Sequence, residues 1–139
     1  MFENTIPILA VRDLAASLDY YLRVLGFTLD FHVEGIIAGV SRDRGHVMLA
    51  EGDQGQPGTW VWFGVDDVEP LYEEFLGRGA KVRLPPTNYL WAYELQLEDP
   101  DGHVLRFAAE PKDGHPVGER LDMHGRRWAM NPDGSWRPA

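Results

Sequence analysis

The chain has 139 residues, no cysteine and a formal net charge of -9, with the acidic excess confined to residues 1–112. The lack of cysteine excludes disulfides, thiolate metal sites and thiol nucleophiles, and the acidic balance argues against nucleic acid as a partner and favours a neutral or cationic small molecule. The N-terminal MFENTIPILAV lacks a basic region, Asp13 follows soon after, and no apolar run is long enough to span a membrane, so we expect a soluble cytoplasmic protein.

Residues 5–52 predict a strand, a helix and three further strands. The stretch TIPILAV alternates and holds β-branched residues, which is typical of a strand. Asp13 is placed to cap a helix whose leucines recur at helical spacing, and Gly26 is placed to end that helix. Three short strands, separated by turn residues, are predicted after it: Phe27–Val33, Ile36–Ser41 and His46–Glu51.

Residues 58–112 repeat this order. TWVWFGV predicts a strand, Asp66 or Asp67 is placed to cap a second helix, and Gly79 is placed to end it. Further strands are predicted over Lys81–Leu84, then, after a proline-bearing loop, over Trp91–Glu98 and Val104–Glu110. The sequence therefore predicts a single α+β domain over residues 1–112, in which tandem βαβββ modules form a cupped mixed sheet. We expect ligands to bind in the cup.

Residues 113–139 lie beyond the repeat. Within them, WAMNPDGSW places two tryptophans around a turn sequence and predicts a small aromatic hairpin. Two indoles are costly to leave in water, so we expect this extension to dock on the body of the protein or on a partner subunit.

Four stretches together resemble a known family. They are IPILAVRDLAASLDYYLRVLGF, GVSRDRGHVMLAEG, WVWFGVDDVEPLYEEF and EDPDGHVLRF, which span residues 5–112 in the family's order. The pattern resembles the vicinal oxygen chelate superfamily, which includes glyoxalases, bleomycin-resistance proteins and extradiol dioxygenases. The resemblance implies the glyoxalase/bleomycin resistance fold.

Metal-dependent members of this family typically place His, Glu or Gln at four points facing the cavity. The matching positions of this sequence hold Ile6, Met48 (or Ala50), Trp60 and Arg106. None of these is a plausible ligand for a divalent metal, and an arginine brings a permanent positive charge to the place of a cation. The resemblance is therefore closest to the bleomycin-resistance branch. Its members are homodimers that bind a drug in clefts between subunits and do not catalyse any reaction of it. This resemblance implies a metal-independent protein without a cofactor that sequesters an aromatic or cationic compound and confers antibiotic resistance.

Strand alternation selects candidate ligand-binding residues on the face opposite the helix. Trp60 and Trp62 share that face, and Glu94 and Gln96 share it with Arg106. Arg106 can pair with Glu94 or anchor an anionic ligand group, and both roles stay open. Two residues of the first module and one residue that follows the proline-bearing loop complete the set. The candidates are Trp60, Trp62, Arg106, Glu94, Gln96, Met48, His46 and Trp91. His103, in the DPDGH turn, is expected at the surface.

Two alternatives stay open. The first is a lyase, isomerase or oxygenase that uses a displaced metal site including His46 and Glu94, or that uses Glu94 as a base without metal. The second is an interaction module whose cup is filled by its own side chains. No residue pattern marks a nucleophile or a general acid, so no catalytic residue is assigned.

Overall fold

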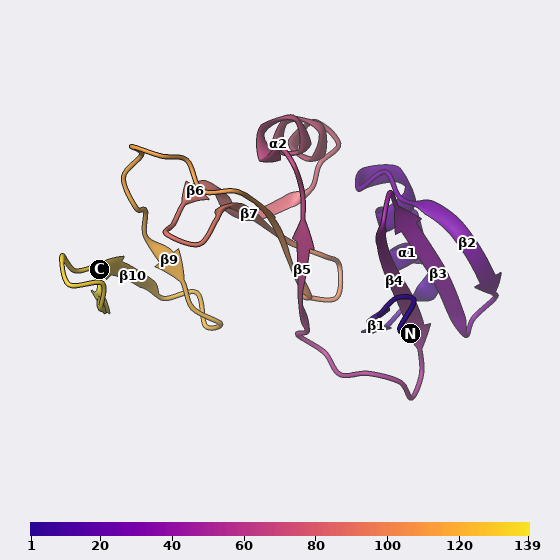
Figure 1. Ribbon diagram of the computed structural model, residues 1–139. Coiled ribbons are helices and arrows are strands. Elements are labelled where there is room, and N and C mark those ends of the chain that lie inside the picture. The colour runs from indigo at the N-terminus through magenta and orange to yellow at the C-terminus, as the bar shows by residue number, and fades with distance from the viewer.

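The computed structural model describes all 139 residues, which form two βαβββ modules side by side and a C-terminal segment (Figure 1). Module one begins with β1 and ends with β4, and its strands pair in the order β1-β4-β3-β2, with β1 parallel to β4. Its elements are β1 (Ile8–Val11), α1 (Leu14–Asp19), the π-helical turn η1 (Tyr20–Val24), β2 (Thr28–Val33), β3 (Ile37–Arg42) and β4 (Gly45–Glu51).

Module two has the same topology, with strands in the order β5-β8-β7-β6 and β5 parallel to β8. Its elements are β5 (Trp60–Gly64), α2 (Val68–Gly77), β6 (Lys81–Asn88), β7 (Tyr93–Glu98) and β8 (Val104–Ala109). The predicted α+β fold with duplicated modules is confirmed. The proline-bearing loop predicted after Leu84 is wrong, because Pro85 and Pro86 lie within β6. They are tolerated there because β6 is an edge strand whose register shifts between Leu84 and Thr87.

Both helical segments lie between the capping residues and the glycines that the sequence predicts. The side chain of Asp13 accepts a hydrogen bond from the amide of Ala16, and that of Asp67, not Asp66, accepts one from Glu69. Gly26 and Gly79 follow the helical segments with φ of +72° and +86°, a conformation that favours glycine.

One hydrophobic core is shared by the two modules. It contains the inward residues of both sheets together with the buried sides of α1 and α2. Phe27 and Phe63 meet edge to face across the modules at 6.0 Å, and Arg42 donates two hydrogen bonds to Glu74 at 2.7 and 3.0 Å. The helix-covered faces of the two sheets therefore share this core, and the opposite face of each sheet lies outside it.

The EDPDGH turn joins the modules, and the prediction that His103 lies at the surface is wrong. Its side chain is fully buried. Nδ1 accepts a hydrogen bond from the Thr59 amide at 3.0 Å and Nε2 donates to the Ala10 carbonyl at 2.6 Å, so both ring nitrogens have partners. Asp99 accepts hydrogen bonds from the His103 amide and from the Tyr21 hydroxyl. Burial raises the pKa of Asp99, and these hydrogen bonds oppose the rise.

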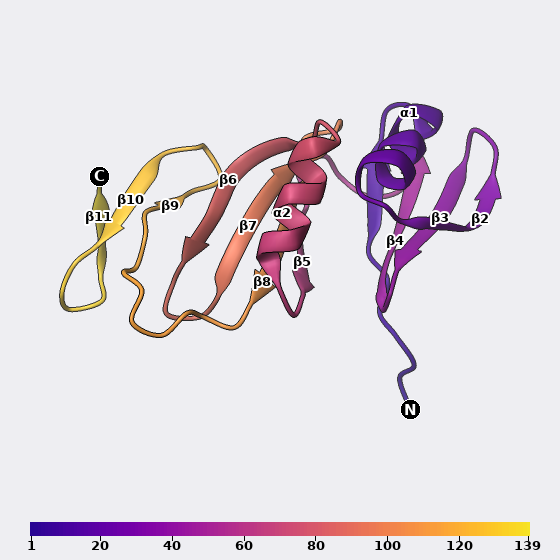
Figure 2. The ribbon, with the colours of Figure 1, turned by 90° about the horizontal axis from the view of Figure 1, so that it is seen from above.

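The C-terminal segment forms a three-stranded antiparallel sheet, β9 (Arg120–Leu121), β10 (Arg127–Met130) and β11 (Trp136–Pro138). Figures 1 and 2 place it beyond β6, at the end of the molecule opposite module one. Asn88, the last residue of β6, ties it down by donating to the carbonyls of Lys112 and His115. No helix in the structure combines the length and the apolarity needed to cross a membrane.

Candidate ligand-binding site

The open face of module two carries most of the candidate residues. On β5, Val61 and Phe63 pack against the core, whereas Trp60 and Trp62 lie on the other face with exposed fractions of 37% and 50%. Trp62 is paired in register with Arg106 of β8. The strand register thus brings the two tryptophans, Arg106 and the open side of β7 onto one surface.

Glu94 and Arg106 form the predicted ion pair. The guanidinium donates to both carboxylate oxygens of Glu94, with Nε–Oε2 and Nη2–Oε1 distances of 2.7 and 2.6 Å. The Glu94 side chain is only 1% exposed, and the indole of Trp91 also donates to it, at 3.3 Å. Arg106 lies over the ring of Trp62 at 4.8 Å. A buried carboxylate is thereby neutralised by a guanidinium that is itself held by an aromatic ring.

Arg83 belongs to the same surface but was not predicted. It donates to the side-chain oxygen of Gln96 at 2.6 Å, lies over the ring of Trp60 at 4.9 Å, and donates to the main-chain oxygen of Asp122. Burial lowers the pKa of Arg83, and the positive charge of Arg106 lowers it further. Arg83 lies within the predicted strand Lys81–Leu84, and the alternation of that strand was the signal available for it, since Val82 and Leu84 are on the core side.

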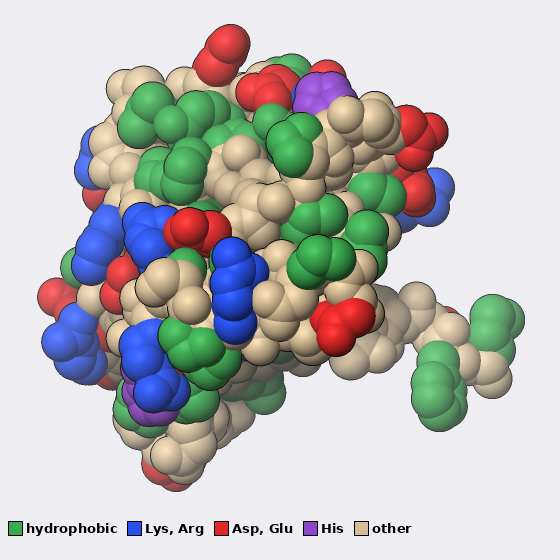
Figure 3. Space-filling model, turned by 90° about the vertical axis from the view of Figure 1, so that its left-hand side faces the viewer, with side chains coloured by type: hydrophobic (Ala, Val, Ile, Leu, Met, Phe, Trp, Pro, Cys, Tyr) green, Lys and Arg blue, Asp and Glu red, His purple; other side chains and the backbone are tan.

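A cavity of about 530 Å³ lies between this surface and the C-terminal segment. Its aromatic wall includes Tyr89 and Trp91, whose rings stack at 4.7 Å, and Trp136 of β11 packs against Trp91 at 6.1 Å. The lining residues come from module two and from the segment around β9: Gly58, Trp60, Tyr89, Trp91, Glu94, Gln96, Arg106, Arg120, Leu121, Asp122 and Met123. Figure 3 views the molecule from the side of the C-terminal segment and shows Lys and Arg side chains beside hydrophobic ones.

The structure brings together five of the eight candidate residues as cavity lining, Trp60, Trp91, Glu94, Gln96 and Arg106. Trp62 lies on the same face beside Arg106 but does not line the cavity. Met48 and His46 are separate from it, on β4 of module one. No residue before Gly58 lines this cavity, so module one of the same chain contributes nothing to its wall. The lining residues of the C-terminal segment were missed, since their contacts depend on how that segment folds back.

The open face of module one has a different character. Met48 lies between Ile8 and Gly39 in the strand register, and the ring of Phe31 covers Gly39. A Cβ on Gly39 would lie 2.3 Å from that ring, so any other residue there would force the ring to shift. His46 lies 3.7 Å from Asp30. This face is mainly apolar and carries no counterpart of the buried ion pair.

The side chains at the four family points do not fit a cation. Arg106 occupies one point with its charge already paired to Glu94, and Trp60 and Met48 offer no hard donor. The displaced set proposed from His46 and Glu94 is divided between two modules, and the structure has no group of three or more His, Asp or Glu side chains placed to hold a metal.

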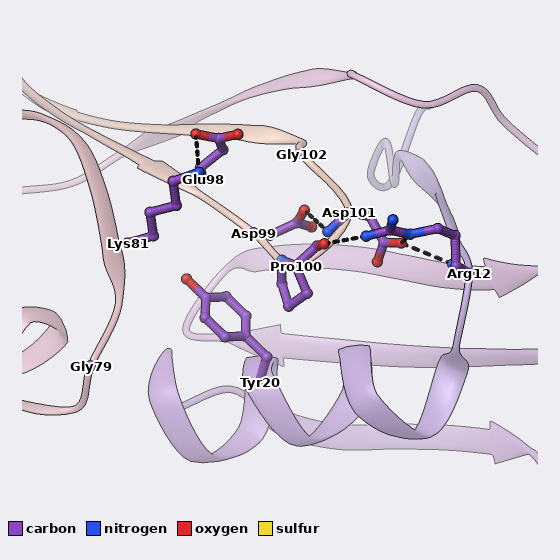
Figure 4. A pocket seen from close by; sticks show the side chains of 9 residues that line it. All are labelled: Arg12, Tyr20, Gly79, Lys81, Glu98, Asp99, Pro100, Asp101 and Gly102. Atoms are coloured by element: carbon purple, nitrogen blue, oxygen red, sulfur yellow. Dashed lines mark hydrogen bonds and ion pairs between the residues drawn. The ribbon is translucent and has the colours of Figure 1, made fainter.

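A second cavity, of about 540 Å³, lies at the junction of the modules and is shown in Figure 4. Its polar groups largely satisfy one another: Arg12 donates to Asp101 at 3.1 Å, and Lys81 pairs with Glu98 at 3.2 Å. Its lining is mostly polar and contains a single hydrophobic residue. The aromatic cavity of module two is therefore the better site for an organic ligand.

Comparison with known proteins agrees with this architecture. Residues 5–107 match the family model described as Glyoxalase/Bleomycin resistance protein/Dioxygenase superfamily. The chain belongs to this superfamily. The match ends before the C-terminal segment, which is thus an addition to the part of the chain that carries the superfamily fold. A comparison with proteins of curated function finds no match.

Solved structures of the superfamily fold are similar over the two modules. TioX from Micromonospora sp. ML1 aligns with a TM-score of 0.69 at 22% identity, over 78% of this chain and 99% of its own. An integron cassette protein from the mobile metagenome of the Halifax Harbour sewage outfall aligns with a TM-score of 0.68 at 26% identity, over 78% and 99%. The bleomycin-binding protein of Streptomyces verticillus, solved with copper(II)-bleomycin, aligns with a TM-score of 0.64 at 24% identity, over 78% and 97%.

Proposed function

We propose that this protein is a metal-independent small-molecule binding protein that sequesters an aromatic compound in the cavity of module two. The observation that carries the proposal is the site itself: an aromatic-lined cavity in which Arg106, at a point where other members place a metal ligand, is paired with the buried Glu94. Flat indole rings offer stacking area to a planar ligand. The bleomycin-binding structural neighbour supports a binding role, and sequestration of a toxic compound would give resistance to it.

A homodimer would complete this cavity. Ile8, Phe31 and Val33 on the open face of module one are all exposed, and an apolar face of this kind is typical of a surface covered by a partner. We infer that module one of a second copy covers the open face of module two. Met48 and His46 of the second copy would then approach the ligand, which explains how residues of module one can belong to a site in module two.

Glu94 is poorly suited to the enzymatic alternative. A general base must meet the substrate with a free lone pair, but both oxygens of Glu94 accept hydrogen bonds from Arg106, and Oε1 accepts another from Trp91. If Glu94 left Arg106 in order to act as a base, its carboxylate would be a buried, unpaired charge.

Metal content provides the first test. Protein purified without chelator is expected to contain only substoichiometric iron, manganese, nickel and zinc by elemental mass spectrometry, and titration with each ion is expected to give no saturable binding. Near-stoichiometric metal would overturn metal independence and would make a search for turnover the next step.

Binding of an uncharged aromatic probe tests the cavity. We expect 2-naphthamide to bind, as measured by calorimetry, and Trp60→Ala to weaken it about tenfold through lost stacking. Leu76→Ala is the matched control, because Leu76 is an exposed residue of α2 outside the cavity. An affinity that is unchanged in Trp60→Ala, or equally weakened in both variants, would contradict binding at this site.

A further inference from the structure

Arginines gather at the cavity of a chain that is acidic overall. Arg106, Arg120 and Arg83 all lie at or behind its walls. The charge of Arg106 is balanced by Glu94. Arg83 is different, because both of its hydrogen bonds go to uncharged oxygens, that of the Gln96 amide and a main-chain carbonyl. Arg83 therefore has no carboxylate as a hydrogen-bond partner, although the nearby carboxylates of Glu98 and Asp122 attract its charge.

Arg120 is the least committed of these groups. It lines the cavity from β9, and its guanidinium lies 5.0 Å from the ring centre of Trp136 and 5.4 Å from that of Trp128. It makes no side-chain hydrogen bond and no ion pair in the structure. Two indoles thus hold a guanidinium beside the cavity while its N–H donors stay available.

The carboxylate on the same wall does not neutralise Arg120. Asp122 is held by the indole N–H of Trp128, by the amides of His124 and Arg126, and by the Arg126 side chain at 2.9 Å. These donors lower the pKa of Asp122 and use its oxygens. Asp122 is thereby committed to the fold of the C-terminal segment.

The positive charges of Arg106, Arg120 and Arg83 all act on Tyr89 in the cavity wall. Burial and Glu94 raise the pKa of the Tyr89 hydroxyl, whereas Arg106, Arg120 and Arg83 each act to lower it. An anion placed near Tyr89 would experience these three positive charges together with the negative charge of Glu94, which Arg106 pairs.

We propose that the C-terminal segment supplies Arg120 as an anion-binding residue, so that the cavity takes a planar aromatic molecule that carries an acid group. The tryptophans provide area for the ring, and a guanidinium fork matches the geometry of a carboxylate. This inference rests on the proposed binding function and replaces the cationic ligand expected from net charge alone. Among the charged residues that line the cavity, Glu94, Arg106 and Asp122 are already paired, and Arg120 is the one left to meet a ligand.

Three probes that share one ring system and differ in charge test the proposal: 2-naphthoate, 2-naphthamide and 2-naphthylmethylammonium. Calorimetry on the full chain is expected to rank naphthoate first, with a dissociation constant about tenfold below that of the amide, the amount typical of a charge-assisted hydrogen bond. The ammonium compound is expected to bind most weakly. Added salt should weaken naphthoate and leave the amide nearly unchanged.

Variants at Arg120 assign the effect. Arg120→Gln is expected to remove the preference for naphthoate over the amide, and Arg120→Lys to keep part of it. Arg127→Gln is the control, since it changes the net charge equally but alters an exposed residue that pairs with Glu119 and does not line the cavity. Thermal unfolding of each variant verifies that the C-terminal segment stays folded.

The outcomes separate this inference from the proposed function. Equal binding of all three probes, or a preference for the ammonium compound, would overturn the anion-binding role while leaving a small-molecule site. A preference for naphthoate that survives Arg120→Gln would also overturn the assignment to Arg120. If none of the three probes binds, both the inference and the proposed binding function are contradicted.

Discussion

The two modules share one topology but differ in the chemistry of their open faces. In module one this face exposes Ile8 and Phe31 and contains a glycine where an aromatic ring lies flat. In module two the equivalent face carries two tryptophans, a buried carboxylate and its arginine partner. A duplicated fold therefore does not require duplicated surfaces: one open face is mainly apolar, and the other carries aromatic and charged groups.

The difference arises from the outward positions of matching strands. Inward positions are apolar in both modules because they build one shared core. The outward positions are free of that requirement, so they can diverge without loss of the fold. Two substitutions on the open faces test this difference, and two at the joint between the modules test what the modules share.

The largest expected effect comes from breaking the ion pair of module two. Arg106→Met leaves the Glu94 carboxylate buried without a partner and should lower the free energy of unfolding by about 3–5 kcal/mol. The double variant Glu94→Leu/Arg106→Met should recover most of this loss, because no unpaired charge is then buried. Urea unfolding measures both. A single variant as stable as the wild type would show that the pair contributes nothing to the fold.

A charge on the open face of module one should act on assembly and not on the fold. Phe31→Glu places a carboxylate in the proposed dimer interface and is expected to weaken dimerisation about 100-fold, corresponding to about 2.7 kcal/mol. Sedimentation should give a mass near twice 15.7 kDa for the wild type and near 15.7 kDa for the variant. Leu76→Glu, on the exposed side of α2, should stay dimeric. A dimeric Phe31→Glu protein would contradict this use of the face.

Removal of the His103 imidazole should loosen the joint between the modules. His103→Ala leaves the Thr59 amide and the Ala10 carbonyl without their buried partner and should cost about 2–3 kcal/mol. Chemical denaturation measures the loss, and hydrogen exchange should locate it at Thr59. Exchange that increases only far from the joint would contradict the bridging role.

The smallest effect is expected at the partly exposed pair that also links the modules. The hydrogen bond from Arg42 holds the pKa of Glu74 below its ordinary value. A lowered carboxylate pKa stabilises the folded state above the unfolded pKa, and this contribution is lost as the pH falls through the folded pKa. Glu74→Gln should therefore be about 1 kcal/mol less stable than the wild type near neutral pH.

This difference should shrink on acidification, because the wild type then loses the charge of Glu74 as well. Unfolding free energies of the two proteins between neutral and acidic pH provide the measurement. Arg23→Gln, which removes an exposed pair with Asp19 within one helix, should show almost no change at any pH. A difference between Glu74→Gln and the wild type that grows at low pH would contradict this assignment.

The sequence by itself determined the duplicated βαβββ order, the capping residue Asp13, a second cap at Asp66 or Asp67, and the strand alternation that places Glu94 and Arg106 on one face. These features follow from local rules, since helix caps and a two-residue period depend only on near neighbours in the chain. The charges and aromatic groups of module two could therefore be predicted together before their distances were known.

Only the tertiary structure decided which faces meet and which charges are balanced. The burial of His103 depends on Ala10, 93 residues earlier, and the place of Arg83 depends on Asp122, 39 residues later. The position of Arg120 beside the cavity likewise follows from the way its segment folds back onto module two. No local pattern encodes such contacts, because they are fixed by the packing of distant segments into one shape.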